Sequence, residues 1–499
     1  MKIQYAFTLA AIALITNAAS AEEPSPEQLF DSAFGEMETS ETPPSEQSGA
    51  NADAPSWDGT VDQAPAASSE APEAPSSLHV QSPPAAQPGS RSFFQNATMS
   101  GLLRNETAYR VRDTAQLTKV RNAALLNETV TFSDDLSVTS SQYGYYDAVF
   151  DLTDHYPDTV RDDQDNQLEL RDAYVDYSSG SLDLRLGRQQ IVWGEAVGLF
   201  IADVVNAKDL REFILPDFDL IRRPDWAVDA ELSHGEAHLE LVYIPFPRFD
   251  KIGTPGSEYE FVLPVPDGVP FEVGENDLPS SNLRNSQYGV RASYLVEGWD
   301  LGAFYLYSWN RSPAYARVVS DSGLFLVPTY DRQNIVGATF SKEVGDYVFK
   351  GELAVNSQSP FSTSDLSDKD GIVHRTYMDS VIGVDTKLFD AVDSNFQLIQ
   401  RTIFNHDASL VDHGDAIRNY VSAWFKTTIG DTNLEPELLL IESLMEVDLM
   451  LRPSLKYRFN DSWDARTGAD LFWGPQRGLF GQFEEKARVY FELSYRFAA

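Results

Sequence analysis

The last predicted strand is Val489-Tyr490-Phe491-Glu492-Leu493-Ser494-Tyr495-Arg496-Phe497, which two alanines follow. Val489, Phe491, Leu493, Tyr495 and Phe497 alternate with Tyr490, Glu492, Ser494 and Arg496. Successive side chains of a β-strand point to opposite faces, so the apolar ones share one face. A period-2 strand with an aromatic end is typical of the last strand of an outer-membrane β-barrel, whose apolar face meets lipid. We expect the barrel-assembly machinery to read this signal from Phe491, Leu493, Tyr495 and Phe497.

The first residues resemble an export signal. Lys2 is basic, Tyr5–Ile15 is apolar, and Ala19-Ser20-Ala21 offers the small residues that signal peptidase prefers. The apolar stretch is shorter than the roughly 20 residues that a membrane-spanning helix needs. We therefore expect residues 1–21 to be a removed signal peptide and the chain to be exported.

Residues 22–90 are acidic and rich in Pro, Ala and Ser, and we expect them to form a disordered periplasmic tail. Within the tail, the capping pattern predicts a short helix near residues 26–34. Its apolar face of Leu29, Phe30 and Phe34 suggests docking to a periplasmic partner or plugging of the barrel; the alternative is a chance apolar cluster. The net charge of −38 makes nucleic-acid binding improbable.

From residue 91 to residue 499 the alternation recurs, and the connectors between strands alternate between short and long. Tight turns are predicted near residues 133–135, 178–180, 234–236, 297–299, 344–346, 390–393, 430–432 and 460–461. Short periplasmic turns and long external loops are the outer-membrane pattern. We therefore predict an all-β transmembrane antiparallel barrel of about 18 strands (16–18), with both termini periplasmic. In one predicted strand the alternation of apolar and polar residues shifts by one position around Asp172, which predicts a bulge.

The inward positions of the predicted strands carry acids and bases in similar numbers, so we expect a polar lumen of mixed charge. Arg452, Lys456 and Arg458 form a basic stripe on one strand, which suggests a site for an anionic headgroup or sugar. The alternative is pairing of these bases with Glu435 and Glu437 on the neighbouring strand.

The most distinctive part of the chain is a long loop that follows the fifth predicted strand. It begins Gly187-Arg188-Gln189-Gln190-Ile191-Val192-Trp193-Gly194-Glu195 and continues through Asp203-Val204-Val205-Asn206 and Asp209-Leu210-Arg211. Asn206 can cap a helix over residues 207–215, which Pro216 would end. We interpret residues 192–224 as a constriction folded into the lumen; the alternative is an external cap. In either position Arg188, Glu195, Asp203 and Arg211 could pair with one another.

These motifs resemble a large family of Gram-negative outer-membrane barrels that is catalogued as a domain of unknown function. The residues that carry the resemblance are Arg188, Gln189, Trp193, Glu195, Asp203, Asn206, Asp209 and Arg211. Residues 468–474 and 481–483 also resemble the family. The resemblance covers residues 93–499 and extends more distantly to alginate-export porins. It implies handling of lipids or hydrophobic compounds together with inner-membrane exporters of the resistance-nodulation-division type.

We therefore expect an outer-membrane channel or transporter for hydrophobic or lipid-like molecules, gated by residues 192–224 and working with periplasmic and inner-membrane partners. The alternatives are an exopolysaccharide export porin and a general porin or structural barrel. An enzyme is not expected, because no spacing places a nucleophile beside an oriented base. The sequence predicts no catalytic residues and no cofactor, and no cysteine is present to build a thiolate metal site.

Overall fold

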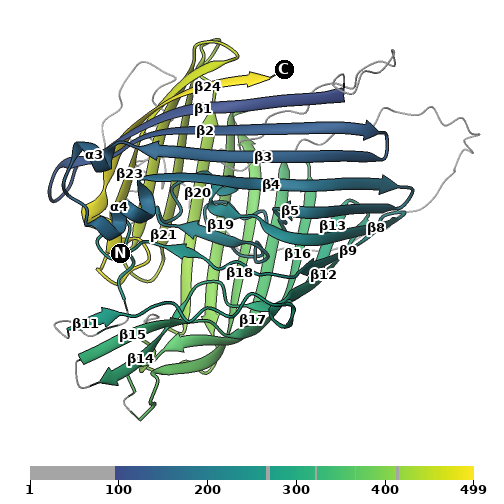
Figure 1. Ribbon diagram of the computed structural model, residues 1–499. Coiled ribbons are helices and arrows are strands. Elements are labelled where there is room, and N and C mark those ends of the chain that lie inside the picture. Colours follow the sequence, from purple (N-terminus) through teal and green to yellow (C-terminus); the bar gives the residue numbers. More distant parts are fainter. Residues whose placement is uncertain are drawn as a thin grey trace, which may run out of the picture. The chain divides into compact units, whose positions relative to one another are not determined.

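The computed structural model describes residues 96–263, 265, 270–320, 323–365, 367–411 and 415–498. The predicted signal peptide (residues 1–21), the predicted tail (residues 22–90) and the predicted docking helix all lie outside these residues. In the described part, eighteen strands form one antiparallel sheet (Figure 1). They are β1 (Ala97–Arg110), β2 (Gln116–Ser133), β3 (Leu136–Asp147), β4 (Asn166–Ser179), β5 (Leu182–Gln189), β8 (Asp225–His234), β9 (Ala237–Ile244), β12 (Gln287–Val296), β13 (Trp299–Trp309), β16 (Arg332–Val344), β17 (Tyr347–Ser362), β18 (Ile372–Leu388), β19 (Val392–Ile403), β20 (Ile417–Thr427), β21 (Leu434–Ser443), β22 (Leu449–Arg458), β23 (Trp463–Trp473) and β24 (Arg488–Ala498).

The sheet closes on itself, because β1 pairs with β24 from Ser100 opposite Ala498 to Arg110 opposite Arg488. Every other barrel strand pairs with its two neighbours in chain order. Closure leaves no unpaired strand edge, which a barrel in lipid requires. The prediction of a transmembrane antiparallel barrel of about 18 strands is confirmed, and the eight tight turns lie where the sequence placed them.

The predicted bulge is also present. The register between β3 and β4 shifts between Ser140 and Gln142, so that Ser140 pairs with Ala173 and Gln142 pairs with Leu170. Two residues of β4, Arg171 and Asp172, therefore face one residue of β3. This extra residue explains why the apolar residues of β4 change from one set of alternate positions to the other at this point.

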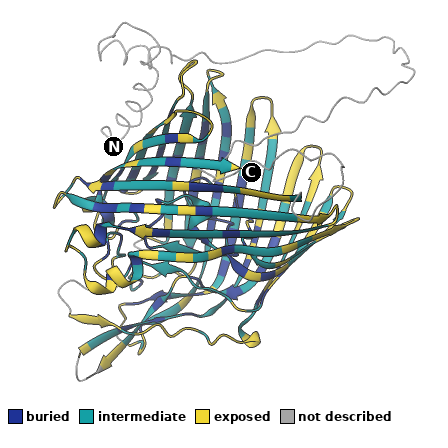
Figure 2. Cartoon of the chain, turned by 45° about the horizontal axis from the view of Figure 1, so that its top comes forward, coloured by how far each residue is buried: buried dark blue, intermediate teal, exposed yellow. Residues whose placement is uncertain are grey.

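The two faces of the barrel differ as the alternation predicts (Figure 2). Large apolar side chains are exposed on the outer face, among them Leu168, Val336, Ile382, Leu398 and Phe491. Aromatic side chains gather where β23 and β24 approach their tight-turn end: the Trp463 and Tyr495 ring centroids lie 4.8 Å apart, and those of Tyr495 and Phe497 lie 6.2 Å apart. An apolar band bordered by aromatic residues is the surface that a bilayer solvates.

Smaller elements belong to the long connectors. Within the described residues, the short helices are α3 (Val149–Leu152), α4 (Asp158–Gln164) and α5 (Phe218–Ile221), and 3-10 turns cover Leu283–Asn285 and Gly481–Lys486. One small sheet joins β10 (Lys251–Ile252), β6 (Ala207–Leu210) and β7 (Arg222–Arg223), and another joins β11 (Phe271–Val273), β15 (Gly323–Thr329) and β14 (Ala314–Ser320). Across the described residues, no helix is both long and apolar enough to span a membrane.

Candidate functional site

The connector between β5 and β8, residues 190–224, packs against the inner wall of the barrel. Residues 207–215 are not the helix that the sequence predicted: Ala207–Leu210 is strand β6, followed by a turn, and the helix α5 comes only after Pro216. Asn206 is not a helix cap, because its Oδ1 accepts from the Ile191 N–H at 2.7 Å and its Nδ2 donates to the Arg223 carbonyl at 3.3 Å. Asn206 thereby ties the two ends of the connector together. We call residues 190–223 the inward segment.

One side of the inward segment packs on the wall formed by β8, β9, β13, β16 and β17. The buried apolar contacts there include Ile191, Trp193 and Val205 from the segment. The Trp193 ring lies 5.2 Å from that of Phe304, and its Nε1 donates to Glu240 at 2.9 Å. Gly289 makes room for it, because a Cβ at that position would lie 2.7 Å from the indole. Trp193 is therefore an anchor of the segment.

The other side packs on the opposite part of the wall, formed by β18–β23. Here Val197, Ile201, Phe213, Ile214 and Leu215 join inward side chains of the strands in one buried apolar cluster. The segment thus reaches across the lumen and has apolar contacts at both ends.

Two further connectors contribute to this cluster. The sequence predicted an inward position for neither, although residues 481–483 belong to the motif that carries the family resemblance. Phe480 and Phe483 come from the connector between β23 and β24, and Tyr259 and Phe261 come from the connector between β9 and β12. The Phe213 ring lies 4.8 Å from that of Phe483. The aromatic residues of these long connectors, which a purely external loop would not bury, were the available signal.

Asp448 holds the β23–β24 connector in this position. Its carboxylate accepts the backbone N–H groups of Leu479, Phe480 and Gly481 at 2.8, 2.9 and 2.8 Å. Burial raises the pKa of Asp448, and the three N–H groups offset part of that effect. This contact requires glycine at positions 474 and 478, where a Cβ would lie 2.8 and 2.6 Å from the carboxylate.

Phe213 adopts a φ of +55°, a left-handed conformation that costs a residue with a bulky side chain about 1–3 kcal/mol. Its ring is nevertheless 3 % exposed and surrounded by aromatic residues. The packing of the ring therefore maintains a strained backbone at the centre of the inward segment.

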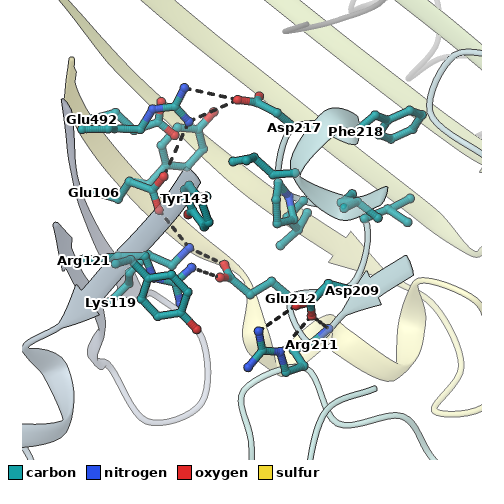
Figure 3. Close-up of a pocket in the computed structure, with 18 of the residues that line it drawn as sticks. Glu106, Lys119, Arg121, Tyr143, Asp209, Arg211, Glu212, Asp217, Phe218 and Glu492 are labelled. Carbon is teal, nitrogen blue, oxygen red and sulfur yellow. Dashed lines mark hydrogen bonds and ion pairs between the residues drawn. The ribbon is translucent and has the colours of Figure 1, made fainter. Parts of the chain in front are cut away.

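On its third side the segment meets a charged wall formed by β1, β2 and β24 (Figure 3). Glu212 pairs with both Lys119 and Arg121, and Arg488 lies 3.7 Å away. Asp217 accepts from Arg104 at 3.2 Å. Burial alone would raise the pKa of Glu212, but attraction by Arg121 and Lys119 exceeds that effect and holds the pKa well below its usual range.

A third polar anchor comes from the opposite wall. Glu352 of β17 accepts the backbone N–H of Glu195 through Oε1 and that of Ala202 through Oε2, the latter at 2.9 Å. The Glu195 side chain itself is 71 % exposed and reaches Lys350 at 3.4 Å.

Arg188, Glu195, Asp203 and Arg211 do not pair with one another as predicted. Arg188 pairs with Glu169, Asp203 with Arg222, and Glu195 with Lys350. Arg211 binds Asp209 and also donates to the Asp163 carbonyl at 2.6 Å. The buried Gln189 donates to the carbonyls of Arg185 and Ala227. Spacing alone could not reveal these partners, because most of them come from other strands and connectors.

The basic stripe on β22 is divided between two environments. Arg452 pairs with Asp470 at 2.8 Å and donates to the Leu215 carbonyl of the inward segment at 2.7 Å. Lys456 and Arg458 both pair with Glu435, at 3.9 and 2.6 Å. Pairing within the wall, the alternative raised above, therefore describes Lys456 and Arg458, whereas Arg452 holds the segment.

A cavity of about 130 Å³ remains between the segment and the charged wall. Nine basic residues line it, namely Arg104, Lys119, Arg121, Arg171, Arg211, Arg223, Arg452, Arg466 and Arg488. Seven acidic residues line it as well: Glu106, Glu169, Asp209, Glu212, Asp217, Glu437 and Glu492. Nine minus seven leaves a net charge of +2 here, in a chain whose net charge is −38.

The fold and this site define a transmembrane β-barrel whose lumen is narrowed by an internal segment. The chain belongs to the family described as a protein of unknown function (DUF1302), whose model matches residues 2–378. The match includes the N-terminal residues, which the resemblance drawn from the motifs left out, and it ends before the last strands. A comparison with curated proteins found no match.

Solved porin structures are similar in fold at low sequence identity. OccK1 (OpdK) of Pseudomonas aeruginosa is 11 % identical with a TM-score of 0.48, and the alignment covers 82 % of this chain and 100 % of that one. OccAB1 of Acinetobacter baumannii is 12 % identical with a TM-score of 0.47, over 82 % and 98 % of the two chains. OmpF of Salmonella typhi is 9 % identical with a TM-score of 0.40, over 80 % and 97 %.

Proposed function

We propose that the protein is an outer-membrane channel in which the inward segment is the gate. The observation that carries the proposal is that residues 190–223 reach across a closed barrel, with a charged cavity beside them at β1, β2 and β24. Barrels of 16–18 strands otherwise leave an aqueous channel. In the proposed orientation the tight turns and both termini are periplasmic.

The contacts of the segment with the charged wall suit a movable gate, in which the apolar contacts at the two ends act as the fixed points. It is held on the charged side by a few ion pairs, through Glu212 and Asp217. At its centre Phe213 maintains a strained φ that movement would relax. Loss of these contacts would free the segment from β1 and β2 and widen the cavity.

The lining of the cavity favours a small charged solute, and an anion in particular, as the permeating molecule. Basic residues outnumber acidic ones there, although acidic residues outnumber basic ones two to one in the whole chain. The electric field of such a lining raises the local concentration of anions. The hydrophobic or lipid-like cargo and the exopolysaccharide implied by the family resemblance remain predictions to be tested beside charged solutes.

The proposed partners also remain predictions. The tail would capture a periplasmic protein through Leu29, Phe30 and Phe34, and that protein would connect the barrel to an inner-membrane exporter of the resistance-nodulation-division type. A chain that lacks residues 22–90 is expected to lose this partner and to keep its conductance.

Cross-linking tests the gate, because the chain contains no cysteine. Arg104 on β1 and Asp217 on the segment are in hydrogen-bond contact at 3.2 Å, so Arg104→Cys with Asp217→Cys places two thiols within reach of a short cleavable thiol reagent. In planar bilayers, bridging should abolish channel openings and cleavage should restore them. Each single variant treated with the same reagent is the control.

The gate would be refuted if the bridged protein conducted like the unbridged one.

The charge preference of the channel is tested separately, by zero-current potentials measured across a salt gradient. We expect selectivity for anions, and a cation-selective channel would contradict the role assigned to the cavity.

A further inference from the structure

The outer face of the wall formed by β24 and β1–β4 carries a hollow of about 780 Å³. The strand register explains it. One row of outward side chains crosses the wall in the order Trp463, Tyr495, Leu103, Ala124, Gly144 and Leu168. Ala124 and Gly144 are the small members of the row, so the surface is indented between Leu103 and Leu168. These two leucines are 49 % and 87 % exposed.

Amide side chains border this hollow although the wall faces lipid. Asn105 and Asn122 lie directly opposite each other in the register, and the Asn105 Nδ2 donates to the Asn122 Oδ1 at 2.9 Å. Among the described residues, no hydrogen bond reaches the Asn122 Nδ2. Gln142 also lines the hollow, two residues before Gly144 on β3 and therefore nearer the aromatic residues of β23 and β24. Its Nε2 donates to the Ser140 hydroxyl.

Asn105 lies within the apolar band, and Asn122 lies between it and Tyr146, whose hydroxyl donates to Asp151 at the loop end of β3. Asn105 is paired with Leu493, which precedes Phe497 at the aromatic border by four residues. Four residues extend about 13 Å along a strand, or roughly 10 Å along the membrane normal at a tilt of about 40°. The apolar band of such barrels is about 25 Å tall. An amide donor at that depth is costly unless a ligand accepts from it.

We propose that this hollow binds one acyl chain of a membrane lipid that carries a hydroxyl group in the middle of the chain. The apolar chain fills the indentation over Ala124 and Gly144, and the Asn122 amide donates to its hydroxyl. A second copy of the barrel fits the surface less well, because a symmetric contact would place one hollow against another and leave a void. The proposal requires only that the barrel lies in a membrane and is independent of its conductance.

Photolabelling in lipid vesicles tests the site on the full chain. The probes are phosphatidylethanolamines with one 10-hydroxystearoyl or one stearoyl chain, each bearing a terminal diazirine. We expect the hydroxylated probe to label peptides of β1–β4 in preference to the plain one. Ala124→Leu fills the hollow and should lower this labelling roughly fivefold or more. Ala303→Leu, on the exposed outer face of β13, is the matched control and should leave it unchanged.

Asn122→Leu separates the two parts of the proposal, and it keeps the site testable if Ala124→Leu fails to assemble. It should remove the preference for the hydroxylated probe while the plain probe still labels the wall. Equal labelling of the wild-type protein by both probes would overturn the proposal. So would unchanged labelling of Ala124→Leu, or disulfide-linked dimers of Ala124→Cys in the membrane, which would identify a second barrel as the occupant.

Discussion

Glu212 is the residue at which the inward segment, β2 and β24 meet. Its side chain is 12 % exposed, those of Lys119 and Arg121 are 10 % exposed and that of Arg488 is 9 % exposed, so four charges share a largely buried site. Opposite charges attract strongly in such surroundings. Removal of one charge leaves its partners buried without a compensating opposite charge. The attachment of the segment to β2 and β24 therefore depends heavily on this single carboxylate.

We expect Glu212→Gln to weaken attachment of the segment by about 3–5 kcal/mol, the usual cost of breaking a buried ion pair. In planar bilayers the variant should open more often or remain open. Glu195→Gln is the matched control, because that side chain in the same segment is 71 % exposed and should matter little. Identical conductance of wild type and Glu212→Gln would contradict the assignment.

The depressed pKa of Glu212 also predicts a pH dependence. A carboxylate whose pKa is lowered in the folded state stabilises that state fully above its unfolded value of about 4.3 and loses this effect as the pH falls below it. Conductance should therefore remain low from neutral pH to about pH 5 and rise in stronger acid. Glu212→Gln should not show this transition, and channel records across the pH range would reveal it.

At the scale of elements, the barrel strands were predictable and the connectors were not. Alternation and turn residues depend on local sequence, and they located the eight tight turns and the bulge at Asp172. The predicted helix over residues 207–215 failed because β6 pairs with β10, from a connector some forty residues later. The inward position of the β23–β24 connector likewise depends on contacts with Asp448, which no local pattern reveals.

The β23–β24 connector gives the prediction at this scale. Asp448→Asn replaces one acceptor oxygen with an amide that faces backbone N–H groups, so we expect the connector to lose about 1–3 kcal/mol of stabilisation. Residues 474–487 should become sensitive to proteases added from outside, while the barrel itself remains intact. Asp461→Asn, in an exposed tight turn, is the control. Resistance equal to that of the wild-type protein would exclude Asp448 as the anchor.

At the scale of the whole molecule, the closed sheet with its exposed apolar outer face predicts how the protein behaves in the cell. It should fractionate with the outer membrane and migrate differently on a gel before and after heating, because a closed barrel resists detergent until it is boiled. Recovery of the processed protein in the soluble fraction after lysis, without heat-modifiable migration, would contradict the membrane assignment.

The apolar cluster inside the lumen has a consequence for assembly. Strands such as β21, with Leu438, Leu439, Leu440 and Ile441 in succession, are apolar on both faces because one face meets lipid and the other meets Phe213 and its neighbours. Until the connectors are in place, the inner face of such a strand exposes as much apolar surface as its outer face and is equally prone to aggregate. Insertion and filling of the interior must therefore proceed together, and a chain from which residues 192–224 are cut out should misassemble rather than become an open pore.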